Sequence, residues 1–227
     1  MNIGVLGTGI VGRTISAKFA GLGHDVNLGT RDVAKSLANT QANRLDNLTL
    51  NDWRKQNPKV KLASFADAAK HGEIVFSATS GKASLEALNL AGEANLNGKI
   101  LVDISNVLDY SRGEPPSLWV SNTDSLAEQI QRAFPHVKVV KSLNTVSARV
   151  MVDPRQVADG EHHVFVSGND TDAKVKVTEI LTEWFGWKHV IDLGDITTAR
   201  YVEMYHPLWM RLMGVIQTPF FNIRIVR

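Results

Sequence analysis

Residues 2–12 read Asn-Ile-Gly-Val-Leu-Gly-Thr-Gly-Ile-Val-Gly, and this stretch decides the fold. An apolar strand runs into Gly7-x-Gly9-x-x-Gly12, and an amphipathic helix is expected over 10–22. Strand, glycine turn and helix in this order predict a dinucleotide-binding fold. Gly7 permits the tight turn, Gly9 lets a pyrophosphate approach the backbone, and Gly12 allows the helix to pack closely. The free N–H groups of the helix N-terminus favour phosphate binding over the alternative of a turn without a ligand.

The end of the second strand, expected over 25–28, indicates which dinucleotide binds. An NAD-binding fold usually carries an acidic residue there to bind the ribose 2′-hydroxyl. Here the strand ends in glycine, followed by Thr30 and Arg31, with Lys35 four residues further on. An arginine can hold a 2′-phosphate through two parallel hydrogen bonds, which favours NADP over NAD. Asp32 is adjacent and acidic, and we expect it to cap the next helix.

The composition is that of an ordinary globular enzyme. The 227 residues allow one or two domains with a sizeable core. A net charge of +2 without a basic block argues against a nucleic-acid partner. The absence of cysteine excludes disulfides and a thiol nucleophile, and it fits a reducing cytoplasm. The sequence shows neither a signal peptide nor an apolar run long enough to span a membrane, so we expect a cytoplasmic protein without a membrane partner.

Strands and helices alternate along the rest of the chain, which predicts an α/β fold with a Rossmann-like, doubly wound, mostly parallel sheet. We assign residues 1–194 to this nucleotide-binding domain and 195–227 to a small C-terminal helical segment. Two segments, 39–58 and 107–121, interrupt the pattern and are expected to be irregular, the second as a loop over the carboxyl ends of the strands. The expected later strands cover 60–63, 73–78, 99–104, 137–143, 162–167 and 188–192, with helices over 65–71, 82–91 and 171–185.

Small neutral side chains follow three of these strands, at the sheet edge where ligands of such folds bind. They are Thr79-Ser80, Ser105-Asn106 and Asn144-Thr145. Such groups suit a reaction whose chemistry belongs to bound cofactors. Helix capping is an equal alternative for each of them. We therefore predict no catalytic side chain, and no metal site, since the adjacent His162 and His163 would face opposite sides of a strand.

The C-terminal segment carries a second strong pattern. Pro207 suits the first turn of a helix, and a strand-like alternation follows at 223–226. The apolar residues could form core, a wall for a flat cofactor, or a subunit interface, and we expect a homodimer. His206 could donate a hydrogen bond or act as an acid, or it could simply pack. The apolar residues that share one side of the expected helix are Leu208, Trp209, Leu212, Met213 and Ile216.

On these residues the chain resembles the coenzyme F420-dependent NADP oxidoreductases, whose partner cofactor is a deazaflavin. It is similar also to the reductase domain of the six-transmembrane epithelial antigen metalloreductases. The resemblance rests on the glycine turn, on Thr30-Arg31 with Lys35, on residues 138–145 and on residues 201–227. It implies that NADP(H) lies along Gly7, Thr8, Gly9, Ile10, Val11 and Gly12, with its 2′-phosphate on Thr30, Arg31 and Lys35 and its nicotinamide near Thr79, Ser80, Asn144 and Ala148. It also implies a deazaflavin in a cleft between the sheet and the C-terminal segment.

The function expected from this reading is hydride transfer between NADPH and a small-molecule redox partner, either the deazaflavin F420 or another flavin. One alternative is an NADPH-dependent reductase of a small carbonyl or imine, for which Arg149 and Arg211 are the candidate charged anchors. The other is a non-catalytic NADP-sensing protein. The chain departs from the family pattern at 39–58, and at Thr79-Ser80-Gly81, where some members carry a proline and an aromatic residue.

Overall fold

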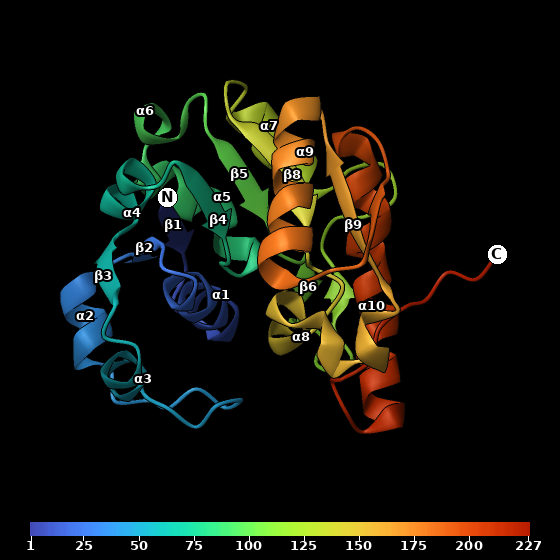
Figure 1. Cartoon of the computed structure of the whole chain (residues 1–227), viewed down its shortest axis with the longest axis horizontal. Coiled ribbons are helices and arrows are strands. Elements are labelled where there is room, and N and C mark those ends of the chain that lie inside the picture. Colours follow the sequence, from blue (N-terminus) through green and yellow to red (C-terminus); the bar gives the residue numbers. More distant parts are fainter.

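The structure, a computed structural model, describes residues 1–227 and is built on one eight-stranded sheet (Figure 1). The strand order is β10-β9-β8-β5-β4-β1-β2-β3. All neighbours are parallel except β8 and β9, which pair antiparallel, so β9 and β10 run against the other six strands. The predicted mostly parallel sheet is confirmed. The strands are β1 Asn2–Leu6, β2 Asp25–Thr30, β3 Val60–Ser64, β4 Ile74–Ser77, β5 Ile100–Asp103, β8 Lys138–Ser142, β9 His163–Gly168 and β10 His189–Asp192.

Helices cover both faces of the sheet, because successive strand residues point to opposite sides. On β5, Val102 joins the apolar core under α1, α3, α8 and α9, whereas Leu101 joins the core under α4 to α7. The helices are α1 Ile10–Gly21, α2 Val33–Ala38, α3 Leu50–Gln56, α4 Phe65–His71, α5 Gly81–Ala91, α6 Glu93–Leu96, α7 Leu126–Ala133, α8 Ala148–Val152, α9 Thr171–Glu179 and α10 Ala199–Ile216. Shorter turns are the 3-10 helices Pro154–Gln156, Ala158–Gly160 and Ile196–Thr198, and a π-helix at Ile180–Phe185 continues α9. None of the helices combines the length and apolar character that crossing a membrane requires.

The two segments expected to be irregular contain regular structure. Within 39–58, Thr49 accepts a hydrogen bond from the Asp52 N–H and so starts α3, whose Trp53 is buried. Within 107–121, a short antiparallel pair forms between β6 Leu108–Asp109 and β7 Ser117–Leu118. Both predictions were wrong for the same reason. A short element with few buried residues has too few apolar positions to show a helix or strand period in the sequence.

The C-terminal prediction needs two corrections. The helix α10 begins at Ala199, eight residues before Pro207, which therefore lies inside the helix. The alternating tail 223–226 forms no strand. Instead, the His163 N–H donates to the Ile223 carbonyl, and the Ile225 N–H donates to His163 Nδ1, so the tail lies beside the start of β9. His162 comes just before β9 rather than within it.

Candidate functional site

The glycine turn joins β1 to α1, and each of its three glycines has a distinct surrounding. Gly7 has a φ of +113°, and a Cβ there would lie 2.6 Å from the Ala78 carbonyl oxygen. A Cβ on Gly12 would lie 1.8 Å from the Gly7 carbonyl oxygen. Gly9, in contrast, has no heavy atom within 4 Å of its would-be Cβ. The turn is therefore closed on the protein side and open on the outer side, as a backbone cradle for a ligand requires.

The N-terminus of α1 also fits a phosphate group. Its N-cap residue Gly9 supplies no side-chain hydrogen bond, and no acidic residue occupies the first turn. The first N–H groups of the helix consequently lack a side-chain partner, and the helix dipole places positive charge beside them. Thr8, Ile10 and Val11 are half-buried along this turn, where the sequence predicted a pyrophosphate.

A buried arginine, whose role the sequence did not predict, holds the glycine turn through hydrogen bonds. Arg13 Nε donates to the Thr8 carbonyl oxygen at 2.9 Å, and Nη1 donates to the Leu48 carbonyl oxygen at 3.0 Å. Asp46 lies 3.5 Å from the same guanidinium. Arg13 thus ties the glycine turn to the segment before α3. The sequence feature that could have revealed this role of Arg13 is a charged residue on the otherwise apolar face of α1.

The residues expected to hold the 2′-phosphate lie at the end of β2. The Thr30 hydroxyl is buried and sits 2.6 Å from the Ser36 hydroxyl. Arg31 Nη2 lies 3.1 Å from Glu86 Oε2 of α5, and both side chains are exposed. Lys35 is exposed, with Nζ 3.8 Å from Asp32 Oδ2. Asp32 accepts the Lys35 backbone N–H at 3.0 Å, which confirms its predicted capping role.

At the end of β4, Thr79 and Ser80 differ in their partners. The Thr79 hydroxyl lies 2.9 Å from the Ser84 hydroxyl. Ser80 is the exposed N-cap residue of α5, but its side chain makes no capping hydrogen bond. Its hydroxyl therefore remains available at the carboxyl edge of the sheet.

Two asparagines join the ends of β5 and β8. Asn144 Nδ2 donates to Asn106 Oδ1 and to the Val202 carbonyl oxygen, each at 3.0 Å, while Asn106 Nδ2 donates to the Asn144 carbonyl oxygen. Asn144 is buried, so the structure engages its amide N–H groups within the protein. Ala148 is half-buried at the first position of α8.

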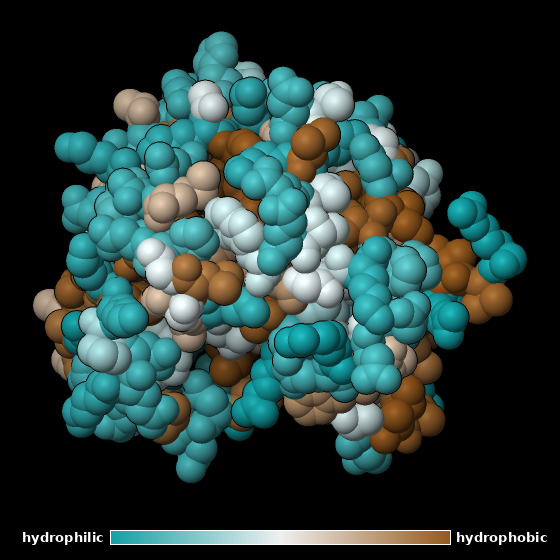
Figure 2. All heavy atoms as spheres, viewed as in Figure 1, coloured by the Kyte–Doolittle hydropathy of each residue, from teal (hydrophilic) through white to brown (hydrophobic).

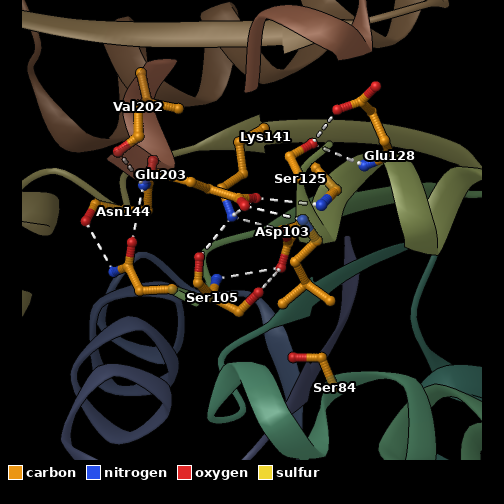
Figure 3. Close-up of polar contacts among 12 residues, drawn as sticks. Ser84, Asp103, Ser105, Ser125, Glu128, Lys141, Asn144, Val202 and Glu203 are labelled. Carbon is orange, nitrogen blue, oxygen red and sulfur yellow. Dashed lines mark hydrogen bonds and ion pairs between the residues drawn. The ribbon is translucent and has the colours of Figure 1, made fainter. Parts of the chain in front are cut away.

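Behind these strand ends lies a buried charge network, which Figure 3 shows. Lys141 of β8 contacts Asp103 Oδ2 at 2.9 Å, Glu203 Oε1 at 3.0 Å and the Ser105 carbonyl oxygen at 2.5 Å. The Lys141 and Asp103 side chains have no exposed surface. All three N–H donors of the ammonium group thus have acceptors, so the network holds Lys141 in its charged form.

Glu203 extends the network from the sheet to the C-terminal helix. Its carboxylate accepts the backbone N–H groups of Leu126 and Ala127, at the start of α7. Burial, reinforced by the charge of Asp103, raises the pKa of Glu203 above its usual range. Burial alone would lower the pKa of Lys141, but the two carboxylates outweigh it and the pKa is raised. The sequence signal for this network was a lysine within a strand that is otherwise apolar.

The inner face of α10 carries a stack of three rings. His206 stacks on Trp209 with centroids 5.4 Å apart, and Trp209 stacks on Phe221 of the tail at 5.3 Å. Burial lowers the pKa of His206 to about 4, so its imidazole is neutral at pH 7. Trp209 is buried, as a wall or core residue would be, whereas Leu208 and Ile216 are exposed. The predicted single apolar side of this helix was therefore wrong for those two residues.

Comparisons with known proteins bear on these features. The model of the family described as "NADP oxidoreductase coenzyme F420-dependent" matches residues 2–107. A crystal structure from Arthrobacter sp. FB24, provisionally described as an F420-dependent NADP reductase, is 52% identical, with a TM-score of 0.94 over 100% of both chains. The F420-dependent NADP reductase of Methanothermobacter marburgensis is 28% identical over 93% of this chain and 92% of its own length. The metalloreductase STEAP3 of Rattus norvegicus is 28% identical over 88% of this chain, but the match spans only 35% of that protein.

Proposed function

Because the chain belongs to the coenzyme F420-dependent NADP oxidoreductase family, we propose that it transfers a hydride between NADPH and a deazaflavin or another flavin-type acceptor. The family membership makes the protein an NADP-dependent oxidoreductase, and the proposal concerns the acceptor. The observation that carries the nucleotide half of the proposal is the glycine turn, whose open side at Gly9 adjoins the uncapped N-terminus of α1. The family membership carries the choice of acceptor.

The proposed NADP(H) site uses residues at the ends of four strands, β1, β2, β4 and β8. The residues of the turn from Gly7 to Gly12 would hold the pyrophosphate through backbone N–H groups. Thr30, Arg31 and Lys35 would surround the 2′-phosphate, of which Arg31 is the side chain best suited to bidentate binding. The nicotinamide would lie near Thr79, Ser80, Asn144 and Ala148, beside the asparagine pair.

The bound nucleotide and acceptor supply the hydride chemistry, and the protein holds their rings in place and excludes water. The charge network and the Asn106–Asn144 pair fix the ends of β5 and β8 against α10. With these contacts, α10 would form one wall of the proposed cleft. In the direction of acceptor reduction, NADPH would supply the hydride, and the accompanying proton would come from bulk solvent outside the contact between the two rings.

The carbonyl or imine alternative is less well supported by the side chains present. Reduction of such a substrate requires a proton donor beside the new hydroxyl or amine. The pKa of about 4 leaves His206 without the imidazolium form at neutral pH. Arg149 and Arg211, the candidate charged anchors, are both exposed. These observations favour a ring acceptor.

The acceptor is tested by incubating the purified protein with NADPH and, in turn, oxidised F420, FMN, FAD and a set of small aldehydes, ketones and imines. We expect NADPH absorbance to decay with at least one ring acceptor. Decay with carbonyls or imines alone would replace the proposal by the alternative. Tight NADPH binding without turnover of any acceptor would support the NADP-sensing protein instead.

A first prediction concerns nucleotide choice. Arg31→Ala should weaken NADPH binding by about 1.5–3 kcal/mol through loss of a charge-assisted contact, and should leave NADH binding nearly unchanged. Fluorescence titration with each nucleotide measures both affinities. Arg132→Ala is a matched control, because Arg132 is equally exposed and also paired, with Asp124, but it lies on α7. Equal affinity of the parent protein for NADPH and NADH would contradict the prediction.

We further propose that two copies of the chain associate through the C-terminal region. Figure 2 shows hydrophobic surface over the end of α10 and along the tail. Val215, Ile216 and Val226 are among the exposed apolar residues there. Contiguous apolar surface of this kind favours association.

A further inference from the structure

The arginine expected to bind the 2′-phosphate already has an anionic partner. Arg31 Nη2 lies 3.1 Å from Glu86 Oε2, and the two side chains are 60% and 59% exposed. The partners come from different elements, because Arg31 follows β2 whereas Glu86 lies on α5. The strand order places β1 between β2 and β4, the strand that leads into α5. This ion pair therefore joins the elements on either side of β1, the strand that leads into the glycine turn.

From this arrangement we propose that Glu86 is a specificity-determining residue, which competes with the 2′-phosphate for Arg31 and so limits the preference for NADPH over NADH. The inference rests on the proposed function, since it concerns the same nucleotide site. Bidentate binding of a phosphate needs two N–H groups of the guanidinium, and Glu86 engages one of its nitrogens. The other N–H groups of Arg31 remain free for a phosphate, but NADPH then brings its 2′-phosphate close to the Glu86 carboxylate on the same guanidinium, whereas NADH brings no phosphate there.

Removing Glu86 has two opposite effects, and their magnitudes decide the outcome. The ion pair holds Arg31 in place before the nucleotide arrives. For an exposed pair this pre-orientation is worth at most about fivefold in an equilibrium constant. Against it stands the repulsion between the carboxylate and a phosphate dianion bound to the same guanidinium. At a separation of about 6 Å this repulsion is worth on the order of tenfold even in the dielectric of water. The repulsion exceeds the pre-orientation, so loss of Glu86 should strengthen NADPH binding.

Nearby acidic and basic groups do not duplicate this role. Asp32 adjoins Arg31 in sequence, but its Oδ1 accepts the Lys35 N–H at the start of α2. Its other oxygen faces Lys35 Nζ. Asp32 is thus occupied by the helix that it caps, whereas the Glu86 carboxylate faces the arginine.

The test is a set of dissociation constants for NADPH and NADH, measured by fluorescence titration of the full chain. Glu86→Gln keeps the shape of the side chain and removes its charge. We expect the dissociation constant for NADPH to fall three- to tenfold and that for NADH to stay within twofold. Adding Glu86→Gln to Arg31→Ala should change NADPH affinity less than twofold, because no guanidinium remains to hold the phosphate close to the carboxylate.

Glu161→Gln is the control, since Glu161 is half-buried and also paired with a basic residue, Lys188, but lies beside β9. Weaker NADPH binding by Glu86→Gln would overturn the inference in favour of pre-orientation, and an equal change for both nucleotides would overturn it as well. No effect of Glu86→Gln in a protein that prefers NADPH would defeat this inference alone. A parent protein that binds neither nucleotide would defeat the proposed function with it.

Discussion

Lys141 lies at the centre of the buried charge network. Its side chain has no exposed surface and joins Asp103 of β5 to Glu203 of α10. Lys141→Met fills a similar volume but leaves two buried carboxylates without a counter-charge. The free energy of unfolding should fall by about 3–5 kcal/mol, as for other broken buried ion pairs. Urea denaturation followed by circular dichroism measures the change.

Lys188→Met is the control for this prediction, because Lys188 pairs with Glu161 at the surface and should change stability by less than about 1 kcal/mol. If Lys141→Met yields no folded protein, Lys141→Met combined with Glu203→Leu removes one unpaired charge and should recover part of the loss. A loss below about 1 kcal/mol for Lys141→Met would contradict the prediction, because it would show that the charge of Lys141 contributes little to the free energy of unfolding.

Among single residues, the sequence correctly predicted the roles of those whose partners are close in sequence. Asp32 caps the helix that begins one residue later, and a Cβ on Gly12 would meet the Gly7 carbonyl oxygen within the motif. Lys141, Glu203 and Glu86 escaped prediction because their partners are remote in sequence. Glu86 lies 55 positions from Arg31. The periodicity of apolar residues indicates which face of an element a side chain occupies. It does not indicate which charged residue of another element lies opposite that face.

Among the elements, α10 and the tail show how a local rule can mislead. Pro207 satisfied the rule for a first helical turn, yet the chain turns into the helix much earlier. There, Asp195 accepts the Thr197 N–H and starts a 3-10 turn that leads into α10. Strands β1 and β2 and helices α1, α4 and α5 lie within two residues of their predicted bounds, because the strands are buried almost throughout and each helix buries one apolar face. The tail has no such face, and side-chain hydrogen bonds hold it instead.

The tail should therefore respond to one side chain. Asn222 Nδ2 donates to His162 Nδ1 and to the His163 carbonyl oxygen, each at 2.8 Å. Asn222→Ala removes both bonds and leaves a buried ring nitrogen without a partner, so stability should fall by about 1–2 kcal/mol. Thermal unfolding measures this change, and faster hydrogen exchange at the Ile225 N–H would locate it. The control is Asn89→Ala, at an exposed position on α5, which should change neither stability nor exchange. If Asn222→Ala also changes neither, the tail is held by apolar packing alone and the prediction is contradicted.

For the molecule as a whole, the testable quantity is its oligomeric state in solution. We expect light scattering after size-exclusion chromatography to give twice the chain mass. Val215→Asp should shift the protein towards the monomer, because Val215 lies in the apolar surface at the end of α10. Val175→Asp is the matched control, since Val175 is equally exposed, at 63%, but lies on α9. A monomeric parent protein, or equal effects of both variants, would contradict an interface at α10.

The order of strands in the sheet has a consequence for how the protein is made. Of the eight strands of this sheet, β1 is made first, and it ends inside the sheet, where Ile3 pairs with both Val26 and Ile74. A nascent chain can close β1 on β2 early, but that edge stays open until β4 emerges. The last long helix then carries Glu203, the second counter-charge of Lys141. A ribosome that stops before α10 thus leaves a sheet with an incomplete charge network and an uncovered face, a species suited to recognition by chaperones.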